Sequence, residues 1–370
     1  MMRQYVWRWQ VKMQPKKRMS RFASVISGLL AGFLFAGGFF AAGAIPAQAQ
    51  AAESAVIIMY HRFGEKSFSS TNITLEQLEE HIKILTSGAY TVLPLPDIIK
   101  KIKDGTPLPA RTVGITIDDA YQSTFTEAWP RLKKAKLPFT VFVSTDHLDR
   151  KLKNMMSWDQ IRTLVKNGVT IGHHTASHLH MADHSQEKNK HDIKTASKRF
   201  QEELGFVPKI FAFPYGEASR TVIDVVRHAG FQVAFGQHSG AFNRASPQYY
   251  LPRFAMNEKY GSPARFKTAV NALALPVAEI TPEDPLIVPA DNPPAIGFTV
   301  TKDVKNLKLL ACYASHAGRA KTLQLGANRI EVRIDQPFPT GRTRINCTLP
   351  AGGGRWHWFG WQYYRPKNAR

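Results

Sequence analysis

The chain has 370 residues, which is enough for one large domain or two of medium size, each with a hydrophobic core of its own. Its 49 basic and 28 acidic residues give a formal net charge of +21 at pH 7. This charge favours anionic partners such as acidic glycans, cell-wall polymers or membrane surfaces, and general solubility explains it equally well. No nucleic-acid-binding motif accompanies the charge, so we expect no nucleic-acid partner.

The first 49 residues carry the features of an export signal. Residues 1–22 contain seven basic side chains and no acid, residues 23–45 are uncharged and apolar, and Pro46-Ala47-Gln48-Ala49 has the form of a cleavage site. This order predicts a secretory signal peptide over 1–49 and a mature protein in the periplasm or outside the cell. Because the apolar stretch is long enough to span a bilayer, an uncleaved anchor that faces the protein outward is the alternative. Removal of the leader leaves a net charge of +14.

The mature part begins with a buried strand and an amphipathic helix. The strand Ala55–His61 ends in a histidine that either lines a site at the sheet edge or hydrogen-bonds a neighbouring loop. In the helix Thr74–Ser87, Thr74 and Gln77 have the spacing of an N-terminal capping box. Further helices are expected at Leu95–Asp104, Ser157–Asn167, Asp183–Leu204 and Ala218–Ala229.

The next strand ends in two adjacent carboxylates. The uncharged run Val113–Ile117 predicts a strand that is buried on both faces, as in a parallel sheet, and Asp118 and Asp119 follow it directly. Parallel strands carry their chemistry at the carboxyl end. Because side chains alternate along a strand, we expect one carboxylate to face a metal and the other the reacting centre. Taken alone, such a pair is more typical of a turn or a helix N-cap.

Two histidines follow another buried strand. After the strand Pro138–Ser144 and a helix, Val169–Ile171 leads to His174 and His178. Their i, i+4 spacing predicts that both lie on one face of a helical turn, where they can bind a single metal ion. With Asp119 they form a set of two histidines and a carboxylate, which suits Zn²⁺ or another first-row divalent ion. His180, His184 and His191 are expected to be surface residues.

A third motif makes the pattern specific. Lys209–Glu217 is an apolar strand that runs into Pro214-Tyr215-Gly216. The order Thr-Ile-Asp-Asp, His-Thr-Ala-Ser-His and Phe-Pro-Tyr-Gly resembles the polysaccharide deacetylase family of carbohydrate esterases. The resemblance covers roughly residues 55–255. It implies a distorted (β/α)7 barrel and the removal of N- or O-linked acetyl groups from chitin-like, peptidoglycan, poly-N-acetylglucosamine or xylan polymers.

The resemblance also implies a role for each site residue. Asp119, His174 and His178 hold a divalent metal, most often Zn²⁺, with Co²⁺ or Ni²⁺ as alternatives. The metal lowers the pKa of its bound water and polarises the acetyl carbonyl, and Asp118 is the general base. The peptide N–H near Tyr215 joins the metal in stabilising the oxyanion.

The sequence departs from the family pattern at two points. The third motif of the family usually has an arginine two residues before the proline, which orients the base, and here that position is Ala212. Arg62 and Arg253 are the candidates to replace this cation. The late Leu-x-His motif that supplies the general acid is also missing. His238 is the best substitute by location, and without an acid an ester suits the enzyme better than an amide.

After the predicted barrel, the sequence becomes rich in proline and then loses its helix signals. Alternating strands and helices over 50–275 predict βα units that form a barrel. Leu251–Phe254 is expected to close this barrel. Prolines predict a linker over 276–294, and a small antiparallel β domain follows over 295–370. Its strands are expected at Gly297–Thr301, Leu307–Ala314, Arg329–Ile334, Arg342–Leu349 and Arg355–Tyr363.

The β domain holds both cysteines and the most aromatic stretch of the chain. Cys312 and Cys347 fall on separate predicted strands, and in an exported protein such an isolated pair predicts a disulfide. The aromatic residues of 356–364 alternate between the two faces of their strand. At least one face must be core, and contact with a glycan is the alternative for the other.

These observations predict an exported, metal-dependent hydrolase that removes acetyl groups from a polysaccharide or oligosaccharide. Two other functions stay open. One is a related metal-dependent amidase or esterase that acts on a small acyl substrate. The other is a glycan-binding envelope protein without turnover, which the intact Asp-Asp and His-x₃-His pairs disfavour.

Overall fold

The computed structural model describes residues 53–302 and 304–367 of the chain. The predicted signal peptide over 1–49 lies outside these residues, so its cleavage and the alternative of an anchor stay predictions. Among the described residues, no helix combines the length and the apolar character needed to cross a membrane.

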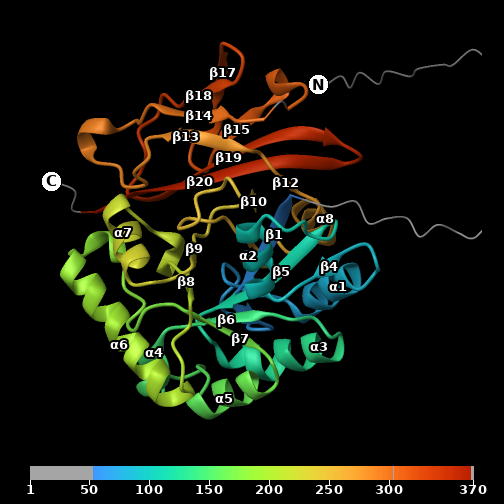
Figure 1. The fold of residues 1–370 in the computed structure, drawn as a ribbon, viewed down its shortest axis with the longest axis vertical. Helices are drawn as coiled ribbons and strands as arrows, with labels where there is room; N and C mark the ends of the chain where they lie inside the picture. The colour runs from blue at the N-terminus through green and yellow to red at the C-terminus, as the bar shows by residue number, and fades with distance from the viewer. Residues whose placement is uncertain (1–52, 303, 368–370) are drawn as a thin grey trace, which may run out of the picture. The chain divides into compact units, whose positions relative to one another are not determined.

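A curled, nine-stranded sheet forms the centre of the first part of the chain (Figure 1). Six strands lie side by side and parallel in the order β1 (Ser54–Tyr60), β5 (Thr112–Asp118), β6 (Thr140–Val143), β7 (Thr170–His173), β8 (Ile210–Ala212) and β9 (Val233–Phe235). The remaining strands are β10 (Ala241–Asn243), antiparallel to β1, β11 (Phe254–Ala255), parallel to β1, and β4 (Thr91–Val92), parallel to β5. The α/β class with a mainly parallel sheet is therefore confirmed.

The sheet is a curled half-barrel rather than a ring of regular βα repeats. Its edges at β9 and β1 are joined through one short segment, because Leu251 bridges to Phe235 and Phe254 pairs with Ile58. Residues 251–254 therefore connect the two ends of the parallel sheet, as predicted, but only through one pairing to β9 and one to β1. β10 interrupts the parallel order, since it follows β9 after a short loop and can only run back along β1.

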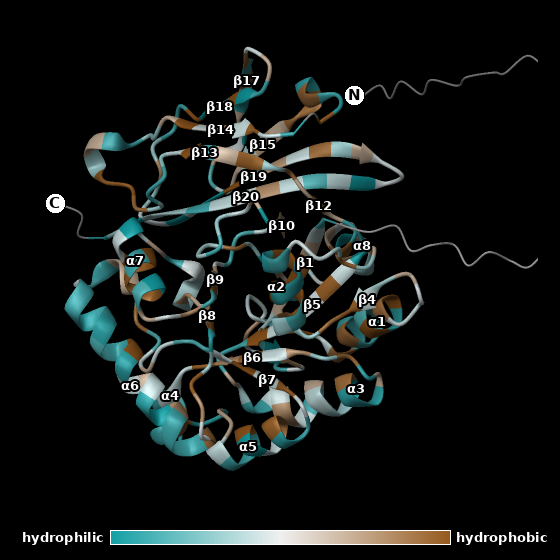
Figure 2. Cartoon of the chain, viewed as in Figure 1, coloured by the Kyte–Doolittle hydropathy of each residue, from teal (hydrophilic) through white to brown (hydrophobic). Residues whose placement is uncertain are grey.

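Helices cover the outside of this sheet (Figure 1). They are α1 (Leu75–Leu85), α2 (Leu95–Asp104), α3 (Trp129–Lys134), α4 (Thr145–Asp149), α5 (Trp158–Lys166), α6 (Gln186–Leu204), α7 (Arg220–His228) and α8 (Pro263–Val270). The predicted capping box at Thr74 and Gln77 starts α1. Helix α6 is largely hydrophilic (Figure 2), and it buries only Asn189, Ile193, Ala196 and Phe200.

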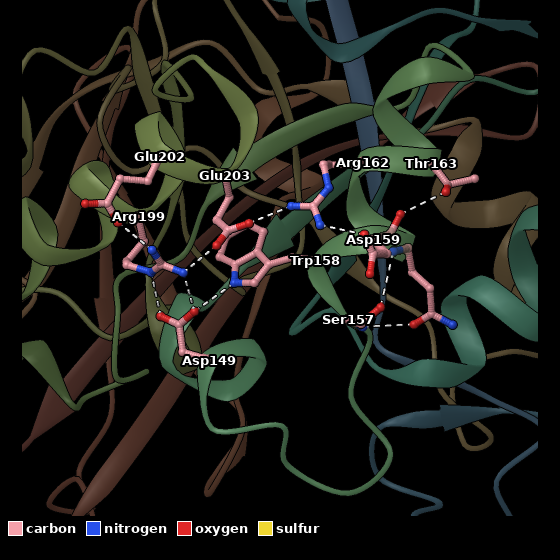
Figure 3. Close-up of polar contacts among 10 residues, drawn as sticks. Asp149, Ser157, Trp158, Asp159, Arg162, Thr163, Arg199, Glu202 and Glu203 are labelled. Carbon is pink, nitrogen blue, oxygen red and sulfur yellow. Dashed lines mark hydrogen bonds and ion pairs between the residues drawn. The ribbon is translucent and has the colours of Figure 1, made fainter.

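A polar network fastens α6 to its neighbours (Figure 3). Arg199 on α6 forms ion pairs with Asp149 at the end of α4, at 2.8 Å, and with Glu203, at 2.6 Å. Glu203 also pairs with Arg162 on α5 at 2.5 Å. Burial acts to raise the pKa of Asp149, but hydrogen bonds from Arg199 and Trp158 outweigh it and lower this pKa. The network holds α6 in place at one side of the sheet.

Two further sheets make up the C-terminal part. One has the order β12 (Leu273–Ala274), β20 (Arg355–Arg365), β19 (Gly341–Gly352), β15 (Ala311–Ala314) and β16 (Gly318–Arg319). The other has the order β13 (Val277–Thr281), β14 (Ile296–Val300), β18 (Arg329–Arg333) and β17 (Lys321–Leu325). Cys312 and Cys347 lie opposite each other on β15 and β19 and form the predicted disulfide.

The boundary between the two parts differs from the prediction. The residues predicted as a linker, 276–294, contain β13, which pairs with β14. The prolines of this stretch lie on either side of residues 277–281. The backbone N–H groups of residues 277–281 can therefore pair with a neighbouring strand. In addition, β12 pairs with β20, and residues 53–302 and 304–367 belong to one compact unit. The chain therefore packs the β sheets directly on the half-barrel.

The remaining elements are short. They are the two-stranded pair β2 (Arg62–Phe63) and β3 (Asn72–Ile73), a π-helical turn at Thr124–Ala128, and 3-10 turns at Met181–Asp183, Pro214–Gly216, Pro289–Asp291 and Leu307–Leu309.

Candidate active site

The carboxyl ends of three neighbouring strands bring the predicted site residues together. Asp118 ends β5 opposite Phe142, and His173 ends β7 opposite Val143 and Phe211. Because the strands run parallel and in register, the residues that follow them reach the same rim of the sheet. Asp118, Asp119 and His174 are accordingly buried close to one another.

Asp119, His174 and His178 form a compact cluster of ligand atoms. The Oδ1 atom of Asp119 lies 3.4 Å from Nε2 of His174 and 3.1 Å from Nε2 of His178. One donor atom from each residue falls within 4.8 Å of the other two. Burial acts to raise the pKa of Asp119, but the two histidines outweigh it and hold this pKa well below its usual value.

The donor set fits a divalent metal ion. Among the described residues, Oδ1 of Asp119 and Nε2 of His174 are buried and have no hydrogen-bond partner. Buried polar atoms without partners are costly, and a cation between them would satisfy both. Two imidazole nitrogens and one carboxylate oxygen are ligands that Zn²⁺ and related first-row ions prefer.

The histidines reach this cluster from a loop, so the predicted helical turn is wrong. Residues 174–180 have no helical segment, and Thr175 and His178 have positive φ angles of 66° and 56°. Side-chain acceptors hold the loop instead: Thr175 Oγ1 accepts from the N–H of His178, and Asp192 on α6 accepts from the N–H groups of Ala176 and Ser177. The i, i+4 spacing of His174 and His178 therefore does not produce a helical turn, because these tertiary contacts hold the segment as a loop.

Backbone atoms near the site orient the first histidine. Nδ1 of His174 lies 2.7 Å from the carbonyl oxygen of Ala212. Because a carbonyl oxygen only accepts, Nδ1 carries the proton and Nε2 presents its lone pair to the cluster. Ala212 therefore contributes through its backbone, although its side chain is not the arginine of the family pattern.

Arg253 supplies the cation that is missing at position 212. Its Nη1 and Nη2 atoms donate to the two carboxylate oxygens of Asp118 at 2.6 and 2.8 Å, and both side chains are fully buried. Burial acts to raise the pKa of Asp118, but Arg253, together with His174 and His61, outweighs it and lowers this pKa. The other candidate, Arg62, pairs with Glu65 instead.

His61 lines the site, the first of the two predicted alternatives, rather than hydrogen-bonding a neighbouring loop. Its Nε2 atom lies 3.9 Å from Oδ2 of Asp118. Burial lowers the pKa of His61, while the charges of Asp119 and Asp118 act to raise it. The histidine at the end of β1 is therefore next to the carboxylate that the sequence predicts as the base.

The Pro-Tyr-Gly turn forms the opposite wall of the cluster. Tyr215 has a positive φ of 59°, its ring stacks on His180 at 3.9 Å, and it meets the edge of His178 at 4.5 Å. His180 is exposed, as predicted, and its Nδ1 lies 2.6 Å from the carboxylate of Glu217. The turn thus holds Tyr215 directly beside a predicted metal ligand.

Comparison with known proteins identifies the family. The family described as "Polysaccharide deacetylase" matches residues 105–234, which include all three motifs. A Staphylococcus aureus poly-β-1,6-N-acetyl-D-glucosamine N-deacetylase is 26% identical over 215 residues, which cover 54% of this chain and 73% of that protein. Residues 105–234, which carry the candidate site, match the polysaccharide deacetylase family. The chain is therefore a hydrolase.

Solved structures share the fold of this deacetylase. The Streptococcus pyogenes deacetylase PplD, in complex with acetate, is 17% identical with a TM-score of 0.55, over 59% of this chain and 98% of that one. IcaB from Ammonifex degensii is 24% identical with a TM-score of 0.52, over 58% and 97% of the two chains. At these identities the likeness establishes the fold alone.

The deacetylase places His238 away from the contacts of the cluster. His238 is buried against the rings of Tyr250 and Trp361, with centroids 4.6 and 5.9 Å apart. Burial lowers its pKa to about 3. A histidine with this pKa is unprotonated at neutral pH, and the acid role of His238 stays a prediction.

Sequence reasoning missed the residues that hold the site loops from a distance. Asp192 holds the histidine loop. Gln362 on β20 donates to the carbonyl oxygens of Tyr215 and Gly216 at 3.3 and 2.7 Å, and Arg342 on β19 donates to that of Tyr215 at 3.3 Å. No motif marks these residues, because their partners are backbone groups far away in the sequence. The β sheets thus contribute to the wall of the site.

Proposed function

We propose that the chain is an exported, metal-dependent deacetylase that hydrolyses acetyl groups, N- or O-linked, on a polysaccharide or oligosaccharide. The observation that carries this proposal is the Asp118–Arg253 ion pair next to the cluster of Asp119, His174 and His178. It puts a carboxylate that is kept ionised beside a set of ligands that fits a divalent cation.

Asp119, His174 and His178 would hold the metal ion, with Zn²⁺ favoured and Co²⁺ or Ni²⁺ as alternatives. When bound there, such an ion supplies Lewis-acid polarisation and lowers the pKa of a coordinated water molecule. His174 is prepared for this role by Ala212, which fixes its tautomer. A cation bound there would satisfy the two buried atoms of Asp119 and His174 that have no hydrogen-bond partner among the described residues.

Asp118 would take the proton of the attacking water molecule. Arg253 keeps this carboxylate ionised in a buried site and fixes its orientation through two hydrogen bonds. His61, 3.9 Å from Asp118, is placed to donate a proton to the leaving group. We assign the acid role to His61 rather than to His238 on position alone, because burial lowers the pKa of both histidines and His61 lies beside the base.

Tyr215 would act through its backbone. Its peptide lies in the turn that packs on His178, and its N–H is proposed to stabilise the oxyanion that forms on the acetyl oxygen. Gln362 and Arg342 hold the carbonyl group of the same residue, so the turn is fixed before the substrate arrives.

The family match and a relative support the proposed substrate class. The Staphylococcus aureus relative is named for N-deacetylation of poly-β-1,6-N-acetyl-D-glucosamine, so we propose an acetylated glycan as substrate. Export is supported by the leader in the sequence and by the disulfide between Cys312 and Cys347, since disulfides persist in oxidising compartments.

Acetate release in the presence and absence of a chelator tests the proposal. We expect activity on acetylated oligosaccharides that chelation abolishes and divalent metal restores. Asp118→Asn should abolish activity while the metal content persists, and Asp119→Asn should lose both. Activity that survives complete removal of metal would contradict the proposal, and so would Asp118→Asn protein with unchanged turnover.

A further inference from the structure

A groove leads from the candidate active site onto the C-terminal sheet. It has a volume of about 850 Å³ and runs from Met59 and His61, past Asn257 and Tyr260, to the faces of β15, β19 and β20. His61 is both part of this groove and 3.9 Å from Asp118. The groove is therefore continuous with the site of the proposed reaction.

Strand alternation gives the groove its chemical character. Facing residues of an antiparallel pair share one side of the sheet, and the pairs Arg344–Gln362, Asn346–Gly360 and Thr348–Trp358 all point toward the half-barrel. The residues between them, including Phe359, Trp361 and Tyr363, pack in the core of the β sheets. One face of the aromatic strand is thus core. On the other face, Gly360 and Gln362 pack against the half-barrel, and Trp356 and Trp358 line the groove.

Exposed aromatic rings lie along the groove. Tyr260, Tyr313 and Trp356 keep 44%, 42% and 39% of their surface exposed, which makes them three of the most exposed large hydrophobic residues in the described chain. Single exposed aromatics are unremarkable, but three in one groove beside an active site form a binding surface. Flat aromatic rings suit the apolar faces of pyranose rings.

The charge in the groove is entirely positive. Arg265, Arg342 and Arg344 line it, and no aspartate or glutamate does. Nη1 of Arg265 is buried without a hydrogen-bond partner among the described residues, and its guanidinium lies 5.1 Å from the Trp358 ring. An unpartnered buried donor favours a ligand that offers carbonyl or hydroxyl oxygens. A ligand with ammonium groups would be repelled.

We propose that this groove binds the sugar residues next to the one being deacetylated, and that it selects an N-acetylated amino-sugar chain over its deacetylated product. This inference rests on the proposed function and assigns the substrate of the same site. N-acetyl groups offer carbonyl oxygens to the arginines, whereas hydrolysis of the amide leaves an amine that is protonated near neutral pH. Each turnover therefore converts a sugar that the groove accepts into one that it rejects.

Binding to the full chain in an Asp118→Asn background tests the groove without turnover. The probes are pentasaccharides of N-acetylglucosamine, β-1,4- and β-1,6-linked, and their fully deacetylated forms. We expect at least one acetylated probe to bind more tightly than its deacetylated form. Trp356→Ala should weaken that binding about 3- to 10-fold, as expected for the loss of one aromatic stack. Arg344→Gln should narrow the preference for the acetylated probe.

Matched controls separate the groove from the rest of the surface. Phe206→Ala removes a ring of similar exposure, and Arg333→Gln removes an exposed arginine of β18, both outside the groove. Neither should change the affinity. Equal binding of acetylated and deacetylated probes, or equal losses in Trp356→Ala and Phe206→Ala, would overturn the inference.

Kinetics on the otherwise unaltered enzyme distinguish failure of this inference from failure of the proposed function. We expect the ratio of kcat/KM for the acetylated pentasaccharide to that for the disaccharide to fall about 3- to 10-fold in Trp356→Ala. A constant ratio in an active enzyme would overturn the proposal that the groove binds sugars, and the proposed deacetylase activity would stand. No acetate release from any substrate would overturn the proposed function, and the binding measurements would still decide on the groove.

Discussion

At the scale of single residues, the site is defined by buried charges that satisfy one another. Asp118 and Arg253 are both fully buried and paired through two hydrogen bonds. Breaking such a pair by removing one partner leaves an uncompensated charge in a medium of low polarity. The same interaction that orients the proposed base therefore also contributes to stability.

Arg253→Gln tests both consequences. Because Arg253 lowers the pKa of Asp118, its loss should raise this pKa and move the acid limb of the kcat/KM profile to higher pH by at least about one unit. The free energy of unfolding should fall by about 3 to 5 kcal/mol. The measurements are a pH–rate profile and urea unfolding. Arg62→Gln is the matched control, and an unshifted acid limb in Arg253→Gln would refute the assignment.

A second buried residue gives a pH dependence of stability. Nε2 of His81 donates to the carbonyl oxygen of Gly261, and Nδ1 accepts from the Tyr60 hydroxyl, each at 2.8 Å; the ring also stacks on Phe266. Burial lowers its pKa from 6.5 to about 4. The folded state therefore resists protonation of His81 more strongly than the unfolded state does.

The sign of the effect follows from this difference. The stabilisation is complete above pH 6.5 and is lost as the pH falls from 6.5 to about 4, with a total of about 3 kcal/mol. Urea unfolding of metal-free wild type and His81→Gln between pH 7 and 4 measures it. The stability advantage of wild type should shrink across this window. A constant difference between the two proteins would show that His81 does not titrate on unfolding.

At the scale of elements, the histidine loop depends on a helix that contains no ligand. Asp192 accepts hydrogen bonds from the N–H groups of Ala176 and Ser177, at 2.9 and 3.3 Å, and from the Ser177 hydroxyl, at 2.7 Å. These bonds hold a loop with two left-handed residues, Thr175 and His178, whose backbone is strained on its own. The network of Figure 3 fixes the same helix, α6, at its other end.

Asp192→Ala should weaken metal binding about 10- to 100-fold, as is typical when groups that orient metal ligands are lost. Asp192→Asn, which keeps one acceptor oxygen, should have a smaller effect. Competition with a chromophoric chelator measures the affinity directly. Lys194→Ala, an exposed residue of the same helix, is the control. If Asp192→Ala binds metal as tightly as the control, the loop is held by other contacts.

At the scale of the whole molecule, the C-terminal sheets contact the loops of the candidate site. β20 pairs with β12, and its Gln362 holds the Tyr215 turn. The approach is closest at Gly360, where a Cβ atom would overlap the carbonyl oxygen of Ser239. Only glycine permits this contact between the sheet and the loop that follows β9.

Gly360→Ala should force the sheet and this loop apart. We expect a loss of about 1 to 3 kcal/mol in the free energy of unfolding and a lower kcat/KM, because Gln362 moves with β20. Gly353→Ala is the control, since a Cβ at this turn position meets no atom, although its positive φ carries a small cost of its own. Denaturant unfolding and acetate release measure the two effects. An active Gly360→Ala enzyme of normal stability would show that the close contact of β20 with the loop after β9 supports neither stability nor activity.

The sequence by itself determined the local features whose cause lies within a few residues. Uncharged runs predicted β5, β6 and β7, the capping box predicted the start of α1, and the three motifs predicted the family and the cluster of Asp119, His174 and His178. These predictions were possible because the burial of a strand and the identity of a ligand set depend on residues that are consecutive or regularly spaced in the sequence.

Only the tertiary structure decided which distant groups complete the site. It selected Arg253 over Arg62 as the partner of Asp118, placed His61 rather than His238 beside that carboxylate, and replaced the helical turn at His174–His178 with a loop held by Asp192. Each choice depends on contacts between residues that are far apart in the chain. Spacing along a sequence carries no record of such contacts, because buried charges and backbone groups are satisfied by whatever partner the fold brings within hydrogen-bonding distance.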